Sequence, residues 1–236
     1  MTACGELGYD VGSIAYATTS VSAGARGPNV LVSPRPDGAD ANGFDEPSLV
    51  FPGLLFPVTP RHVARSRGLL NDEEWRDLQS TVPMGLGCGR GTSRDGTETG
   101  IRGRIVQFGP LITARAGYLR YALILTPTPY SVHTDAFFGV VPLYPDVKRC
   151  PMGNLLVEEE AWRQALGVGV ENVMIGIKDV LMVRRVNLVA GPPNTGCNDE
   201  QMRVVDDALL QWLGCAPAGA SGGGAVQDGA QGAGAG

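Results

Sequence analysis

Basic charge, aromatic residues and histidine are all scarce in this chain of 236 residues. Lys and Arg number 19 against 24 Asp and Glu, which gives a formal net charge of -5, and aromatic residues make up 6%. A dedicated nucleic-acid binder usually carries a basic excess, so any RNA contact must come from a local patch. The only two histidines, His62 and His133, exclude a histidine-rich metal site.

The cysteines and the apolar segments exclude further classes of protein. The cysteine count is odd and no C-x-x-C pair occurs, so neither a zinc cage nor a disulfide framework is indicated. The five are Cys4, Cys88, Cys150, Cys197 and Cys215. Free thiols are typical of a reducing cytoplasm, no signal peptide is visible, and no apolar stretch approaches the roughly 18 residues of a membrane span. We expect a cytoplasmic protein without a membrane contact, metal or cofactor.

Glycine and proline are abundant instead. The 34 glycines and 17 prolines predict many turns and short strands, so the expected fold class is mainly β with short helices (α+β). Strands are expected at residues 11–18, 29–33, 101–108, 121–126 and 136–143, and one long strand or two at residues 173–186. The apolar segment 49–58 contains Pro52 and Pro57, so it is expected to form an edge or bulged strand.

Three helices are predicted from their start signals. Asn71 is followed three residues later by Glu74, as in a capping box, and Pro83 should end or kink that helix. An acidic start predicts a short helix at residues 158–166. Asn198 caps the final helix, which has an apolar stripe at helical spacing. The stripe is Met202, Val205, Leu209, Trp212 and Leu213.

The chain divides into four segments. Residues 89–100 are rich in glycine and lack hydrophobic periodicity, which is typical of a linker. A phosphate-binding loop would need a following Lys-Ser/Thr and a helix, and neither is present. Residues 216–236 are almost all Ala, Gly and Ser, and we expect this tail to be disordered. Two candidate domains remain, at residues 1–88 and 101–215.

The two candidate domains share short motifs. Asn71-Asp72-Glu73 recurs as Asn198-Asp199-Glu200, and Leu86-Gly87-Cys88 recurs as Leu213-Gly214-Cys215, at the same offset. A duplication with a truncated first copy explains both matches, and the two lobes would then pack as an intramolecular pseudo-dimer. Chance similarity between two capped helices is the alternative.

The second domain carries an ordered set of motifs. Residues 120–127 read RYALILTP, residues 140–143 read VVPL, and residues 178–188 read KDVLMVRRVNL. This order, opened by a strand at 101–108 and closed by a capped helix, resembles the MazF/PemK family of toxins from type II toxin–antitoxin pairs. The resemblance implies a small SH3-like β-barrel (the CcdB/PemK-like fold) and sequence-specific cleavage of single-stranded RNA.

The resemblance also implies a site. In that family an Arg of the Arg-Pro strand and a Thr or Ser after the Val-Pro strand assist attack of a ribose 2′-hydroxyl on its own phosphodiester. Arg120 matches the arginine and can neutralise charge on the phosphate, whereas Tyr144 stands where the Thr or Ser is expected. Both are the candidate catalytic residues. The candidate RNA-binding residues, each of which also fits a solvated or structural role, are Arg102, Arg104, Arg115 and Thr126.

Two functions from different classes follow. An endoribonuclease would have single-stranded RNA and an antitoxin as partners, and the retained Arg120 favours it. A non-catalytic module on the same fold would bind a protein, as CcdB toxins bind gyrase, or serve as a phage-type accessory protein, and the substitution at Tyr144 favours this alternative. His133, in a Ser-Val-His-Thr-Asp loop, is a weaker acid–base candidate. A homodimer and an intramolecular pseudo-dimer both remain open.

Overall fold

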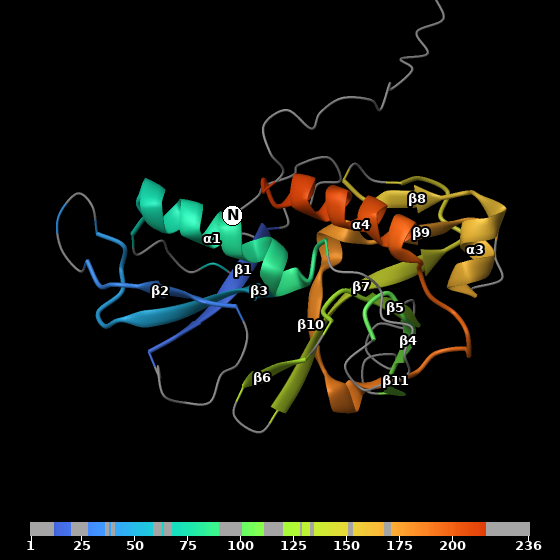
Figure 1. Cartoon of the computed structure of the whole chain (residues 1–236), viewed down its shortest axis with the longest axis horizontal. Helices are drawn as coiled ribbons and strands as arrows, with labels where there is room; N and C mark the ends of the chain where they lie inside the picture. Colours follow the sequence, from blue (N-terminus) through green and yellow to red (C-terminus); the bar gives the residue numbers. More distant parts are fainter. Residues whose placement is uncertain are drawn as a thin grey trace, which may run out of the picture.

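Two antiparallel sheets and three helices make up the described part of the chain (Figure 1). The structure is a computed structural model, and it describes residues 12–19, 28–35, 38, 41–58, 63, 68–89, 101–110, 120–127, 129–132, 135–150, 153–167 and 171–215. The predicted tail at 216–236 and residues 90–100 of the predicted linker lie outside these ranges.

The smaller sheet has three strands in the order β1-β3-β2. They are β1 (Gly12–Thr18), β2 (Val30–Val32) and β3 (Ser48–Val58). Of the two forms expected for segment 49–58, an edge strand or a bulged strand, the structure shows the bulged one, and β3 is the central strand of the sheet. The strand is bulged, since Ala15 and Tyr16 of β1 pair with Leu55 and Phe51. Pro52 falls within this bulge, where no regular ladder hydrogen bond is required of it.

Helix α1 (Asp72–Leu86) lies along the smaller sheet (Figure 1). The capping box is confirmed, because the Glu74 N–H donates to Asn71 Oδ1 at 2.8 Å and the Asn71 N–H donates to Glu74 Oε2 at 2.9 Å. Pro83 does not end the helix, which continues to Gly87 with φ of 74° in the left-handed region. A proline in the last turn removes a single helical hydrogen bond, and Gly87 supplies the actual stop.

The larger sheet has eight strands and carries the candidate site. Its order is β11-β4-β5-β7-β9-β8, and β6 and β10 also pair with β7. The strands are β4 (Ile105–Phe108), β5 (Tyr121–Ile124), β6 (Tyr130–Val132), β7 (Asp135–Pro145), β8 (Leu155–Val157), β9 (Val173–Ile175), β10 (Leu181–Arg184) and β11 (Leu188–Ala190). The 3₁₀ turns η2 (Ile177–Asp179) and η3 (Arg185–Asn187) divide the segment expected to hold one or two strands.

The strands of the larger sheet do not close into a barrel within the described residues. Along the path β11-β4-β5-β7-β10 they share a buried cluster that includes Phe108, Ile124, Phe138 and Val183. Turn η3 connects β10 to β11, but these two strands are not paired with each other. The expected class, mainly β with short helices, is confirmed, whereas the SH3-like barrel and the pseudo-dimer stay predictions.

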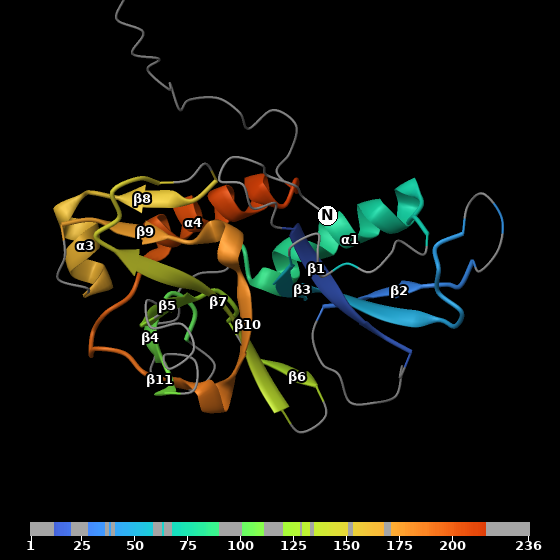
Figure 2. The same ribbon diagram turned by 180° about the vertical axis from the view of Figure 1, so that it is seen from behind.

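The two sheets share one core. Helices α3 (Glu160–Leu166) and α4 (Asp199–Trp212) pack on the larger sheet. The largest buried cluster joins Leu209 of α4 and Leu143 of β7 to Leu55 of β3 and Leu86 of α1. Seen from behind, β10 lies close to β3 (Figure 2), where Met182 belongs to the same small cluster as the central strand's buried residues. Apolar burial therefore holds the two sheets together.

Helices α1 and α4 lie next to each other near the centre of the molecule (Figure 1), and the C-terminal end of each contacts the middle of the other. Gln79 Nε2 of α1 donates to the Gly214 carbonyl at 3.1 Å. The Gly89 N–H just after α1 donates to Asp206 Oδ2 of α4 at 2.8 Å. The two Leu-Gly-Cys motifs thus lie at one junction. The intramolecular pseudo-dimer and the duplication both stay predictions.

Candidate functional site

The two residues predicted to be catalytic belong to neighbouring chain segments: Arg120 directly precedes β5, and Tyr144 lies in β7. Tyr121 pairs with Leu143 in the antiparallel ladder of β5 and β7, so one further step would place Arg120 opposite Tyr144. The Arg120 carbonyl accepts a hydrogen bond from the Phe108 N–H at 3.0 Å, which fixes the start of β5 from its other side. Opposed residues in an antiparallel pair present their side chains to the same face, with Cβ atoms about 5 Å apart. Arg120 is exposed and Tyr144 is half-buried.

Asp179 belongs to this site and was missed by the sequence analysis. The Tyr144 hydroxyl donates to Asp179 Oδ2 at 2.8 Å. Turn η2 is held against β7 because the Gly176 N–H donates to the Pro142 carbonyl at 2.9 Å. A Cβ at Gly176 would lie 2.7 Å from Tyr144 Cε2 and 3.1 Å from Asp179 Oδ2. Gly176 thus permits Tyr144 and Asp179 to approach each other closely. The only sign of Asp179 in the sequence was its place in the motif at residues 178–188.

The surroundings of Asp179 change its proton affinity. Burial raises the pKa of Asp179 above the ordinary 3.8, while the hydrogen bond from Tyr144 and the charge of Lys178 act in the opposite direction. Lys178 Nζ lies 5.0 Å from the centre of the Trp212 ring, a cation–π contact that keeps the ammonium beside the turn. A carboxylate whose pKa is raised is a better proton acceptor than an ordinary one.

Arg102 and Thr126 lie inside the protein rather than on a surface that could face RNA. The Arg102 side chain is 1% exposed, forms an ion pair with Asp206, and donates from Nη1 to the Leu125 carbonyl at 3.0 Å. Thr126 is fully buried, and its Oγ1 accepts a hydrogen bond from the Gly139 N–H at 3.1 Å. A buried guanidinium cannot bind a phosphate in solvent without leaving its carboxylate. Both side chains therefore have structural partners inside the protein, and their RNA-binding role stays a prediction.

Arg104, the other described arginine among the candidates, lies away from Arg120. Arg104 is exposed, but its carbonyl accepts from the Ile124 N–H. Ile124 is four residues along β5 from Arg120, a separation of about 13 Å in a strand. Arg104 instead lines a polar hollow of about 550 Å³ at the N-terminus of α4. Arg115, and likewise His133, lie outside the described residues.

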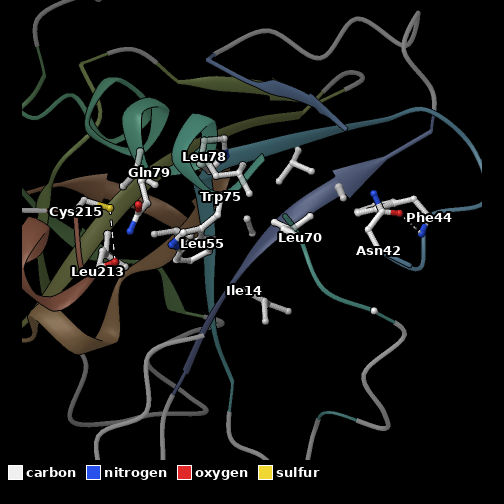
Figure 3. Close-up of a pocket in the computed structure, with 16 residues that line it drawn as sticks. Ile14, Asn42, Phe44, Leu55, Leu70, Trp75, Leu78, Gln79, Leu213 and Cys215 are labelled. Carbon is white, nitrogen blue, oxygen red and sulfur yellow. Dashed lines mark hydrogen bonds between the residues drawn. The ribbon is translucent and has the colours of Figure 1, made fainter. Parts of the chain in front are cut away.

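An apolar cavity lies between α1 and the smaller sheet (Figure 3). Its volume is about 380 Å³. Trp75 and Leu78 of α1 line it together with Ile14 of β1, Leu55 of β3 and Leu213 at the end of α4. Trp75 is 44% exposed and Ile14 is 43% exposed. Large apolar side chains therefore meet solvent at the mouth of this cavity.

Within the part of the chain that the structure describes, no group of three or more His, Cys, Asp or Glu side chains is placed to hold a metal ion. None of the described helices is both long and apolar enough to cross a membrane. No family model matches the chain, and no curated protein matches its sequence.

Proposed function

We propose that the chain is an endoribonuclease of the MazF/PemK type, which cleaves single-stranded RNA at the Arg120–Tyr144 pair. The observation that supports this function is the pairing of Tyr121 with Leu143, because continuing this register by one residue would put Arg120 and Tyr144 on one face of the strand pair. The consecutive antiparallel pairing β11-β4-β5-β7-β10 supports a relation to an SH3-like barrel. The expected partners are single-stranded RNA and an antitoxin, and the expected compartment is the cytoplasm.

Arg120 supplies the positive charge that the reaction needs. The guanidinium is always protonated and can grip two phosphate oxygens at once. The ribose 2′-oxygen attacks the adjacent phosphorus, so the O2′–P bond forms and the P–O5′ bond breaks. The products are a 2′,3′-cyclic phosphate and a 5′-hydroxyl, whose oxygen takes a proton from water. Negative charge builds on the phosphate oxygens during the attack, and Arg120 stabilises that charge.

Cleavage of end-labelled single-stranded RNA by the purified protein tests the proposal. We expect Arg120→Ala to lower kcat about 100- to 1,000-fold, the usual cost of removing one donor to a developing oxyanion. Arg104→Ala is the matched control, because Arg104 is an exposed arginine directly before β4, and it should leave the rate unchanged. An RNA with a 2′-deoxy sugar at the scissile nucleotide should resist cleavage. Equal losses in both variants, or no cleavage by the folded wild-type protein, would refute the proposal.

A protein-binding module is the second candidate, and the cavity beside α1 favours it. Trp75 and Ile14 expose apolar surface at its mouth, and aromatic side chains in such positions anchor many protein interfaces. If the chain acts in this way, growth inhibition on expression in bacteria survives Arg120→Ala and is lost in Trp75→Ala. The reverse pattern supports RNA cleavage.

A further inference from the structure

We propose that Asp179 is a positioning residue that receives the proton of the attacking ribose hydroxyl through Tyr144, an inference that rests on the endoribonuclease function proposed above. A neutral phenol that accepts a proton must at the same time give up its own hydroxyl proton. It therefore needs a proton acceptor beside it. The Tyr144 hydroxyl donates to Asp179 Oδ2 at 2.8 Å. A hydroxyl that donates to a carboxylate presents its lone pairs elsewhere and can accept a second hydrogen.

The proton transfer is balanced as follows. The proton of the 2′-hydroxyl passes to Tyr144 Oη while the phenolic proton passes to Asp179 Oδ2. The electron pair left on the 2′-oxygen forms the bond to phosphorus, and the P–O5′ pair leaves with the 5′-oxygen, which water protonates. Asp179 then releases its proton to solvent, so Tyr144 ends the cycle as a neutral phenol.

The fold holds this relay in place before substrate binds. Turn η2 is attached to β7 by the Gly176 N–H to the Pro142 carbonyl and closed by the Asp179 N–H to the Gly176 carbonyl, both at 2.9 Å. The longer tyrosine side chain thus reaches a carboxylate on a neighbouring turn. Preorganised hydrogen bonds of this kind avoid rearrangement during the reaction. The arrangement explains how a tyrosine can stand where the related toxins have Thr or Ser.

Two charged or titratable groups act on Asp179. Tyr144 faces it from β7, and Lys178 precedes it on the same turn. Helix α4, which also packs on this turn, presents the Trp212 ring to Lys178. Burial outweighs both influences and raises the pKa of Asp179 above 3.8. The ionised, proton-accepting form therefore becomes populated as the pH rises through this elevated value.

The test is the pH dependence of RNA cleavage by the wild-type protein and three variants. We expect Asp179→Asn and Tyr144→Phe each to lower kcat about 100- to 10,000-fold, with little change in KM, and the double variant to lose no more than either. The wild-type rate should rise with pH as Asp179 ionises, and both variants should lose this rise. Tyr121→Phe is the matched control, because Tyr121 is the neighbouring tyrosine on the same strand pair, and it should behave as wild type.

The outcomes separate this inference from the function on which it rests. If the folded wild-type protein does not cleave RNA, the endoribonuclease function fails and the relay fails with it. If wild type cleaves and Asp179→Asn keeps its rate and pH profile, the relay alone is overturned. If Asp179→Asn does not fold, as judged by circular dichroism, Tyr144→Phe decides, because it removes only the phenolic oxygen. A rising limb that persists in Tyr144→Phe then overturns the relay.

Discussion

Asp206→Asn should destabilise the protein strongly, because Asp206 neutralises a buried arginine at the junction of the two sheets. The Asp206 side chain is 7% exposed and that of Arg102 is 1% exposed. One carboxylate oxygen accepts from Arg102, and the other accepts from the Gly89 N–H at 2.8 Å. Arg102 also donates to the Leu125 carbonyl at 3.0 Å. The pair thus ties α4 to the end of α1 and to the strand that leads from Arg120.

The magnitude follows from the charge that the substitution leaves behind. Asparagine has nearly the same size as aspartate and keeps an acceptor for the Gly89 N–H, but it leaves the Arg102 guanidinium buried without a counter-charge. Removing one partner of a buried ion pair costs about 3–5 kcal/mol. The exposed neighbour Asp207 is the matched control, and Asp207→Asn should change stability by no more than about 0.5 kcal/mol. Replacing both partners, as Arg102→Met with Asp206→Leu, should restore most of the loss, because no unpaired charge then remains.

Urea denaturation followed by tryptophan fluorescence gives the free energy of unfolding for each variant. The expected order of stability is wild type, Asp207→Asn, the double replacement, and then Asp206→Asn well below the others. If Asp206→Asn costs no more than Asp207→Asn, the buried pair does not hold the junction together and the reasoning is refuted.

Two further predictions concern the segment that joins α1 to this pair. Gly87→Ala should cost more stability than Gly89→Ala. Both glycines have φ of 74°, a conformation that costs a non-glycine residue roughly 1–2 kcal/mol. At Gly87 the new Cβ would also lie 2.5 Å from Pro127 Cδ, whereas at Gly89 it would meet no atom within 4 Å. Equal losses in urea denaturation would contradict the steric argument. Burial, followed by the Asp206 charge, raises the pKa of Cys88 from 9.0 to about 12. The thiolate fraction of Cys88 near pH 8 is therefore about 1,000-fold below that of an unperturbed thiol. We expect iodoacetamide to label Cys88 hardly at all, as measured by mass spectrometry. Between pH 9 and about 12 the Cys88 thiol is protonated in the folded state and ionised in the unfolded state. The contribution of Cys88 to the free energy of unfolding is therefore complete below pH 9 and is lost as the pH rises toward about 12. An alkaline loss of stability that is unchanged in Cys88→Ala would count against this reasoning.

Helix starts and strand positions were predictable because local contacts set them. Asn71 and Asn198 each cap a helix through a residue three positions later, and both capping boxes form. Short apolar runs became β2, β5 and β7 close to their expected bounds. The helix beyond Pro83 is the exception, because its stop depends on the backbone of Gly87.

The sequence by itself thus determined the class of fold and the helix caps, and it supplied Arg120 and Tyr144 as candidate site residues that stay predictions. Only the tertiary structure decided that β3 is central, that Arg102 is buried, and that Asp179 lies beside Tyr144. The physical reason is range: 35 residues separate Tyr144 from Asp179, and 104 separate Arg102 from Asp206. In a sequence, an arginine that will be buried against a distant carboxylate looks the same as one that will face solvent, because the burial and the partner arise only when the sheets and helices pack together.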